Sequence, residues 1–232
     1  MKALTLCLLA GFAFMAKAQN YIYLADPAIV LYDGIYYMYG TEMKPQKGFP
    51  VLQSNDLLKW EVPANAKNGY ALEKGNNVYG DWGFWAPQVF KRGDTFFMIY
   101  TANENIAIAE SASPTGPFMQ KEVVELKADT RQIDPFLFFD DDGKIYLYHV
   151  RLNRGNTIWV AEFKDDFSGI KEETLQQCIT ATETWEDTKR FRSPQIIEGP
   201  TVIKRNGFYY LFYSANDFQN IDYAVEIGRA HV

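Results

Sequence analysis

The amino-acid sequence predicts an all-β protein, and more specifically a β-propeller. Aromatic residues make up 16% of the 232 residues, including 17 Phe and 15 Tyr, and aromatic side chains favour the pleated, half-buried surface of a sheet. A hairpin-like pattern also recurs four times, and a repeat of this kind is typical of propellers and other repeat folds. Few segments show sustained helical periodicity, which agrees with an all-β fold.

Each repeat consists of a short apolar strand, a polar turn and an aromatic strand, which predicts a hairpin. Its prolines, at positions 27, 87, 135 and 200, are separated by roughly 50 to 65 residues. Further strand-like stretches at 51–54, 106–109 and 157–161 lie between the hairpins. Four strands per repeat are typical of a propeller blade. A β-sandwich with accidentally similar hairpins is the alternative, and four matches in register favour the propeller.

Composition and charge exclude several classes of protein. Hydrophobic residues make up 47% and charged residues 22%, so the chain can bury a core and is not disordered. The net charge is −6, and the sequence contains no basic stripe, so nucleic acid is not an expected partner. No segment after the N-terminus is apolar enough to span a bilayer, so no membrane partner is expected.

Residues 1–18 are predicted to be a signal peptide. Lys2 supplies a positive charge, residues 3–16 form an apolar run, and Ala16-Lys17-Ala18 provides small residues for signal peptidase. The mature protein would begin near Gln19 and be exported to the periplasm or the extracellular space. The alternative is a buried N-terminal helix.

Three acidic residues occupy a repeated position. In a propeller the first strand of each blade lines the central channel, so residues at one place in successive repeats form a ring. We assign Asp26, Ala86, Asp134 and Glu198 to that place. Like carboxylates crowded in a partly desolvated site raise at least one pKa, which provides an acid at neutral pH. Hydrolysis of a glycosidic bond requires such an acid together with a carboxylate that activates water.

The same segments resemble glycoside hydrolase family 43, over residues 21–225. The motifs that carry the resemblance are Ala25-Asp26-Pro27, Gly83-Phe84-Trp85-Ala86-Pro87, Ile133-Asp134-Pro135-Phe136 and Ile197-Glu198-Gly199-Pro200. The resemblance implies a five-bladed β-propeller, of which about four blades are present. It also implies an inverting hydrolase that acts on terminal xylose or arabinofuranose linkages of plant polysaccharides or oligosaccharides.

The resemblance further implies a role for each site residue. Asp26 would be the general base, Glu198 the general acid, and Asp134 the residue that tunes and orients the acid. Trp85 and Phe49 are predicted to form an aromatic wall that binds the sugar, with ordinary core packing as the alternative for both. A non-catalytic carbohydrate-binding propeller, or a related five-bladed enzyme acting on fructosides or by phosphorolysis, are the competing functions.

No metal or cofactor is expected in the site. The run Asp140-Asp141-Asp142-Gly143 is compatible with a calcium loop, but a tight hairpin turn is the favoured interpretation. A structural calcium ion elsewhere in the full-length protein remains open. His149 follows an aromatic strand and is expected to be a structural histidine with satisfied hydrogen bonds, with a position in the channel as the alternative.

The C-terminal end of the sequence departs from the repeat. Residues 19–225 are predicted to form an incomplete propeller domain, because a fifth repeat would need about 50–65 further residues. Residues 226–232 show no strand pattern, and they match the translation of a short-read sequencing adapter. We therefore expect them to be a non-native tail, and we expect an open propeller to expose blade edges that closure normally hides.

Overall fold

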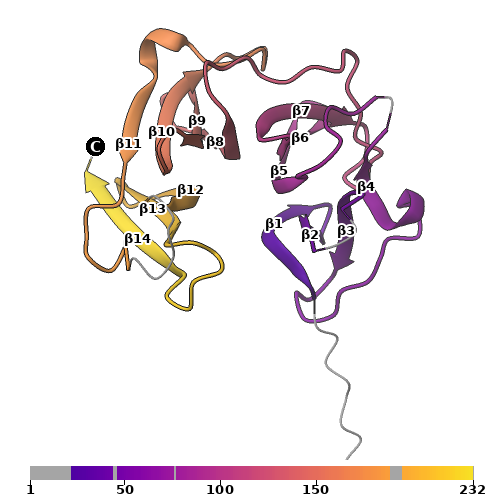
Figure 1. Cartoon of the computed structure of the whole chain (residues 1–232). Coiled ribbons are helices and arrows are strands. Elements are labelled where there is room, and N and C mark those ends of the chain that lie inside the picture. The colour runs from indigo at the N-terminus through magenta and orange to yellow at the C-terminus, as the bar shows by residue number, and fades with distance from the viewer. Residues whose placement is uncertain (1–21, 44–45, 76, 189–194, 232) are drawn as a thin grey trace, which may run out of the picture.

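The computed structural model describes residues 22–43, 46–75, 77–188 and 195–231. Four antiparallel sheets surround a common central space (Figure 1). We refer to them as blades 1 to 4. Blade 1 contains β1 (Leu24–Tyr32), β2 (Ile35–Glu42), β3 (Gly48–Ser54) and β4 (Tyr70–Glu73), and blade 2 contains β5 (Trp85–Arg92), β6 (Thr95–Ala102) and β7 (Asn105–Ser111).

Blades 3 and 4 follow the same plan. Blade 3 contains β8 (Gln132–Phe139), β9 (Ile145–Leu152), β10 (Asn156–Phe163) and β11 (Gln176–Ile179), and blade 4 contains β12 (Ile197–Arg205), β13 (Phe208–Ala215) and β14 (Ala224–His231). Two 3₁₀ helices, η1 (Lys67–Gly69) and η2 (Glu172–Thr174), lie in connections. The all-β propeller prediction is confirmed, and the sandwich alternative is wrong.

The first strand of every predicted hairpin is the innermost strand of its blade. These strands contact one another in order, β1 with β5, β5 with β8 and β8 with β12. The ring is open between blade 1 and blade 4 (Figure 1). The structure therefore contains about four blades of the five-bladed propeller, as predicted.

The hydrophobic core is divided among the three interfaces between consecutive blades. The cluster between blades 1 and 2 is rich in aromatic residues, including Tyr39, Phe84 and Tyr100. Two further clusters join blade 2 to blade 3 and blade 3 to blade 4. Cys178 is the single cysteine of the described ranges and is unpaired, so packing between blades, rather than a disulfide, holds these sheets together.

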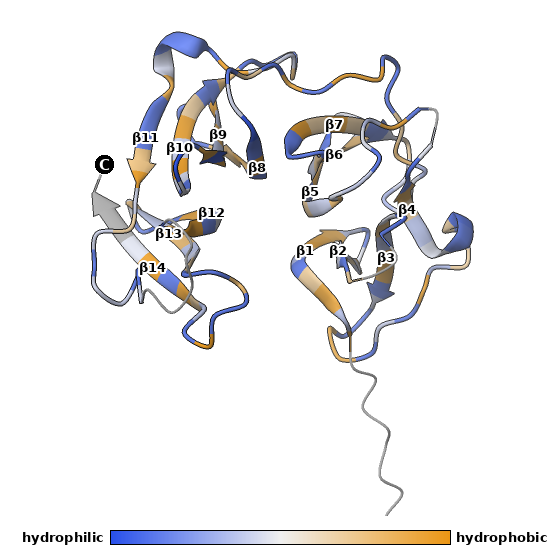
Figure 2. Ribbon diagram, in the orientation of Figure 1, coloured by the Kyte–Doolittle hydropathy of each residue, from blue (hydrophilic) through white to orange (hydrophobic). Residues whose placement is uncertain are grey.

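Blades 1 and 4 carry uncovered apolar side chains. Val30 packs toward blade 2, whereas its neighbours Ile29 and Leu31 are exposed, because successive residues of a strand point to opposite faces. Val225 and Ile227 of blade 4 are likewise exposed, and apolar segments colour the strands beside the opening in Figure 2. Blades 1 and 4 therefore each present apolar surface to solvent.

Residues 226–231 form part of a strand, although the sequence shows no strand pattern there. β14 extends to His231 and pairs with the whole of β13, from Ala224 opposite Ala215 to His231 opposite Phe208. Antiparallel pairing uses backbone N–H and C=O groups, so a strand can form there without a side-chain pattern. The predicted signal peptide lies outside the described residues. Within the described ranges, the structure contains no helix long and apolar enough to cross a membrane.

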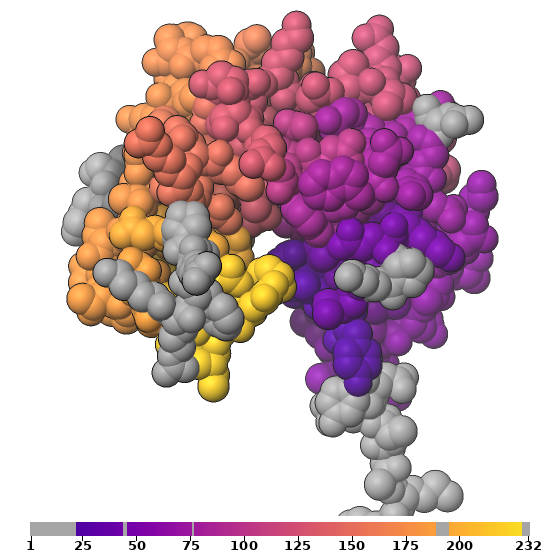
Figure 3. All heavy atoms as spheres, in the orientation of Figure 1, coloured from indigo at the N-terminus to yellow at the C-terminus, as the bar shows by residue number. Residues whose placement is uncertain are grey.

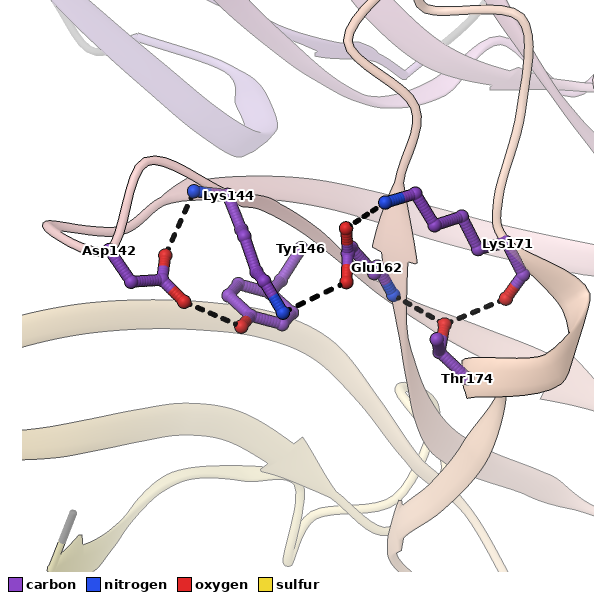
Figure 4. A network of polar contacts seen from close by, with 6 residues as sticks. All are labelled: Asp142, Lys144, Tyr146, Glu162, Lys171 and Thr174. Atoms are coloured by element: carbon purple, nitrogen blue, oxygen red, sulfur yellow. Dashed lines mark hydrogen bonds and ion pairs between the residues drawn. The ribbon is translucent and has the colours of Figure 1, made fainter.

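A polar network holds the outer part of blade 3 (Figure 4). The carboxylate of Glu162 forms ion pairs with Lys144, at 3.2 Å, and with Lys171. Asp142 accepts hydrogen bonds from the backbone N–H of Lys144 at 2.8 Å and from the hydroxyl of Tyr146 at 3.0 Å. The network joins the β8–β9 turn to β9, β10 and the chain that leads into η2.

A second polar contact joins blade 3 to blade 4. Asp140 accepts a hydrogen bond from Lys204 Nζ at 2.7 Å and another from the hydroxyl of Tyr209. Burial of the Asp140 carboxyl acts to raise its pKa, but these two hydrogen bonds, a third from the N–H of Asp141 and the charge of Lys204 together lower the pKa. The lowered pKa means that the contact stabilises the fold above the ordinary aspartate pKa, and that this contribution is lost as pH falls through the folded-state value.

We predict that Asp140→Asn lowers the free energy of unfolding by about 1–3 kcal/mol at pH 7, since the ammonium of Lys204 loses its buried charged partner. The difference from wild type should shrink in acid, where Asp140 itself becomes protonated. Urea unfolding at several pH values measures both quantities. Asp141→Asn, in the same turn but 85% exposed in its side chain, is the matched control and should change stability by less than about 0.5 kcal/mol.

Candidate active site

Every inner strand carries a β-bulge at the same place. Pairing with the second strand of the blade shifts register between Ala25 and Ala28, Trp85 and Gln88, Ile133 and Phe136, and Glu198 and Thr201. The first bulged residue has a positive φ, namely Asp26 (49°), Ala86 (44°), Asp134 (53°) and Gly199 (64°). Proline follows in each case, and it suits a bulge because it has no N–H that would need a partner in the ladder.

This register corrects the predicted ring. The residue equivalent to Asp26 and Asp134 in blade 4 is Gly199, not Glu198. Glu198 lies one position earlier, opposite Ser214, and its equivalent in blade 2 is Trp85. In blade 4 a glycine separates Glu198 from Pro200, whereas Asp26 and Asp134 directly precede their prolines. Glu198 is therefore the last paired residue before the bulge and not the bulged residue itself.

The bulged residues join consecutive blades. The backbone N–H of Ala86 donates to Thr41 Oγ1 of blade 1 at 2.9 Å, and the N–H of Asp134 donates to Thr101 Oγ1 of blade 2 at 2.9 Å. At the third interface the N–H of Gly199 donates to Asp134 Oδ2 at 3.0 Å. A side-chain oxygen near the inner strand of one blade thus accepts the bulge N–H of the next.

Sequence reasoning missed the two threonines. Thr41 also donates from its hydroxyl to Asp26 Oδ2 at 2.5 Å, so it holds the predicted base and the next blade together. A signal was present in the sequence, because three of the four aromatic strands reach a hydroxyl residue fourteen positions after the motif proline, at Thr41, Thr101 and Ser214. In blade 3 the register-equivalent residue is Val150, and there the Asp134 carboxylate takes over as the acceptor.

The three predicted carboxylates lie close enough to interact. Burial raises the pKa of Asp134 well above its ordinary value, and the negative charges of Glu198 and Asp26 raise it further. Burial also raises the pKa of Glu198 to about 7; the charges of Asp26 and Asp217 act in the same direction, whereas a hydrogen bond from Asn156 opposes them. Inner strands of three different blades therefore bring these acids to one site.

The space-filling view shows that the ring of blades is hollow at its middle. A small opening near the middle of the molecule is bounded by indigo atoms of blade 1 and yellow atoms of blade 4 (Figure 3). Asp26, on the blade 1 side, is exposed, whereas Asp134 and Glu198 are half-buried. The site thus combines a solvated carboxylate with two carboxyl groups that are reluctant to ionise, which is the arrangement that acid–base hydrolysis needs.

The two aromatic residues of the predicted wall differ. Trp85 is half-buried and meets the exposed ring of Trp82 edge-on, with centroids 5.8 Å apart. Gly83 has φ of +64°, which favours glycine, and a Cβ there would make a tight contact of 3.2 Å with the Trp85 ring. Phe49 has no exposed surface and packs on Phe84. It belongs to the core, and its prediction as a sugar-binding residue is wrong.

The acidic run between β8 and β9 forms a hairpin turn, as the favoured interpretation predicted. The N–H of Gly143 donates to the carbonyl of Asp140 at 3.1 Å, and the N–H of Asp140 to the carbonyl of Lys144 at 3.0 Å. Among residues 22–43, 46–75, 77–188 and 195–231, the structure contains no group of three or more His, Cys, Asp or Glu that could hold a metal ion.

His149 differs from the expectation. It is fully buried, and neither ring nitrogen makes a hydrogen bond of ordinary geometry. Burial and the nearby guanidinium of Arg151 lower its pKa to about 3, so the imidazole is neutral at physiological pH. The satisfied hydrogen bonds expected for His149 are therefore not found at ordinary geometry.

Comparison with known proteins identifies the family. The chain matches the family described as glycosyl hydrolases family 43 over residues 21–231. It belongs to that family. The family 43 motifs quoted above are the bulged inner strands of the four blades.

Relatives of the chain are longer than the chain itself. A xylosidase/arabinosidase of Butyrivibrio fibrisolvens is 25% identical over 211 residues, which cover 88% of this chain and 39% of that protein. An extracellular endo-α-(1→5)-L-arabinanase of Bacillus subtilis is 25% identical over 229 residues, covering 89% of this chain and 65% of that protein. The chain therefore spans less than two thirds of the length of these curated relatives.

Solved structures support the same family and fold. The crystal structure of an endo-1,4-β-xylanase from Bacteroides thetaiotaomicron is 41% identical, with a TM-score of 0.82, over 92% of this chain and 70% of that chain. A thermostable family-43 glycoside hydrolase is 31% identical, with a TM-score of 0.77, over 90% of this chain and 69% of that chain.

We predict that Thr41→Val and Thr101→Val each lower the free energy of unfolding by about 1–3 kcal/mol, because each leaves the bulge N–H of the next blade without its acceptor. The two variants are matched controls for one another, since only Thr41 also donates to a site carboxylate. At the equivalent position of blade 3 the side chain of Val150 has no hydroxyl, so Val150→Ala should show only the loss of packing. Denaturant unfolding measures all three; unchanged stability in both threonine variants would contradict a structural role for these hydrogen bonds.

Proposed function

We propose that the protein is an inverting glycoside hydrolase that cleaves terminal xylose or arabinofuranose linkages of plant polysaccharides or oligosaccharides. The observation that carries the proposal is the electrostatic interaction of Asp26, Asp134 and Glu198, which come from three blades. Crowded acids of this kind cost stability, and hydrolysis gives a reason for them.

In the proposed reaction Glu198 is the general acid. Its pKa of about 7 keeps a large fraction protonated at neutral pH, and the proton passes to the glycosidic oxygen as the bond to the anomeric carbon breaks. Asp26 accepts a proton from water on the opposite face of the sugar, and the resulting hydroxide oxygen bonds to the anomeric carbon. One water is consumed, and Glu198 ends ionised while Asp26 ends protonated.

Asp134 is proposed to tune the acid. Its carboxylate accepts the N–H of Gly199, which directly follows Glu198, so it also positions the strand that carries the acid. Asp134 and Glu198 repel one another when both are ionised, and a pair of this kind retains a proton to higher pH than either group alone. We therefore assign to Asp134 the role of keeping the acid protonated.

The substrate class is supported by the named activities of the relatives. Their names refer to xylosidase/arabinosidase, endo-arabinanase and endo-xylanase activities, which share pentose linkages. The solvent-exposed Trp82 and the half-buried Trp85 offer flat apolar surface suited to a sugar ring. Export through the predicted signal peptide of residues 1–18 would bring the enzyme to an extracellular polysaccharide, and we include it in the proposal.

We predict that Glu198→Gln and Asp26→Asn each lower kcat by about 10²–10⁴-fold, the usual contribution of a general acid or base, while KM changes little. The alkaline limb of the wild-type kcat/KM profile should fall near pH 7, following Glu198. Asp33→Asn, which changes an exposed carboxylate at the β1–β2 turn, is the matched control and should retain wild-type rates. Near-normal turnover in both site variants would refute the assigned roles.

A substrate panel tests the activity itself. Nitrophenyl xyloside, arabinofuranoside and galactoside report cleavage of terminal sugars, and release of short products from xylan or arabinan reports internal cleavage. We expect hydrolysis of the xyloside or the arabinofuranoside. Binding of oligosaccharides with hydrolysis of none of them would favour the non-catalytic carbohydrate-binding propeller.

A further inference from the structure

We propose that Asn156 is a positioning residue that determines which oxygen of Glu198 carries the transferable proton; this inference rests on the proposed function. Asn156 Nδ2 donates to Glu198 Oε2 at 3.1 Å. Asn156 comes from blade 3 and Glu198 from blade 4, so the contact spans the interface between two blades. Asn156 is not part of the motifs that carry the family resemblance.

The backbone of Asn156 also contacts the residues that lead into β12, the strand that carries Glu198. Its N–H donates to the carbonyl of Gln195 at 3.0 Å, and it forms a parallel β-bridge with Ile196. Gln195 and Ile196 lie directly before β12, in which Glu198 is the second residue. One residue of blade 3 therefore fixes both the path of the chain into β12 and the carboxyl that β12 carries.

The β9–β10 connection explains why Asn156 lies at this place. The N–H of Asn153 donates to the carbonyl of Gly155 at 3.1 Å. Arg154 and Gly155 have φ of 56° and 132°, and the glycine makes this sharp reversal accessible. Asn156 is then the first residue of β10, paired with Leu152, so its backbone is held rigidly on both sides.

The chemistry of the amide gives the contact its direction. An ionised carboxylate only accepts hydrogen bonds, so the amide presents its NH₂ group, which only donates. Oε2 is therefore occupied as an acceptor, and a proton on Glu198 resides on Oε1. Oε1 is then the atom that donates to the glycosidic oxygen, and Asn156 stabilises the carboxylate that remains after the proton has left.

The Asn156 amide differs in kind from the charged groups around Glu198. The negative charges of Asp26 and Asp217 favour the protonated acid, while a hydrogen bond from the phenol of Tyr223 favours the carboxylate. The Asn156 amide does not titrate, so its effect on Glu198 is constant across the working range.

Leaving-group dependence in Asn156→Ala, made in the full chain, tests the inference. If the Glu198 proton is no longer held on Oε1, kcat should fall most for substrates whose leaving group must be protonated. We expect kcat to fall by about 10–100-fold for unactivated xylo- or arabino-oligosaccharides, part of the usual general-acid contribution, but by less than about 3-fold for a dinitrophenyl glycoside. We also expect the alkaline limb of kcat/KM to move to higher pH, because a donor to the carboxylate has been removed. Asn153→Ala, at an exposed position of the same connection, should match wild type.

A titration that needs no activity separates this inference from the proposed function. The ¹³C shift of the Glu198 carboxyl, assigned by its absence in Glu198→Gln, should titrate at higher pH in Asn156→Ala than in wild type. An unchanged midpoint in a folded variant, or an equal loss of kcat for all leaving groups, would overturn the positioning role. If the midpoint moves but wild type hydrolyses no glycoside, the proposed function fails and the contact between Asn156 and Glu198 stands.

Discussion

The bulge in each inner strand is the constraint on which the rest of the structure depends. The bulged residue does not pair with the second strand of its own blade. In blades 2, 3 and 4 its N–H donates instead to a side-chain oxygen of the preceding blade. The same distortion re-aims the bulged side chain, which in blades 1 and 3 is an aspartate. Assembly of the ring and construction of the site therefore use one backbone feature.

Blade packing supports this arrangement against the repulsion within it. The raised pKa values of Asp134 and Glu198, caused first by burial and then by neighbouring carboxylates, cost folding free energy at neutral pH. The apolar clusters between consecutive blades and polar contacts such as Asp140 with Lys204 hold the blades in register despite that cost. The destabilising carboxyl groups lie at the centre of the ring, and the stabilising contacts lie between the sheets. Function and stability therefore depend on different residues, and function has a cost in stability.

Individual residues show how far sequence reasoning reached. The prolines identified the hairpins and the inner strands, because a proline before an apolar run marks a place without a ladder N–H. The same reasoning assigned Glu198 to the bulge position, which Gly199 occupies. The sequence pattern does not show which residue of a strand is bulged. It assigned Phe49 to a sugar-binding wall, whereas Phe49 lies in the core with Phe84. Thr41 and Asn156 escaped notice, since a lone hydroxyl or amide carries no pattern of its own.

The sequence by itself determined the repeat, and with it the all-β propeller, the order of the blades and the three acids that the repeat positions single out. Those properties follow from local patterns of apolar, aromatic and turn residues. Only the tertiary structure decided which groups contact the acids, which aromatic rings reach solvent, and that the last residues pair with β13. Each of these depends on atoms from segments far apart in the chain, whose distances no local pattern specifies.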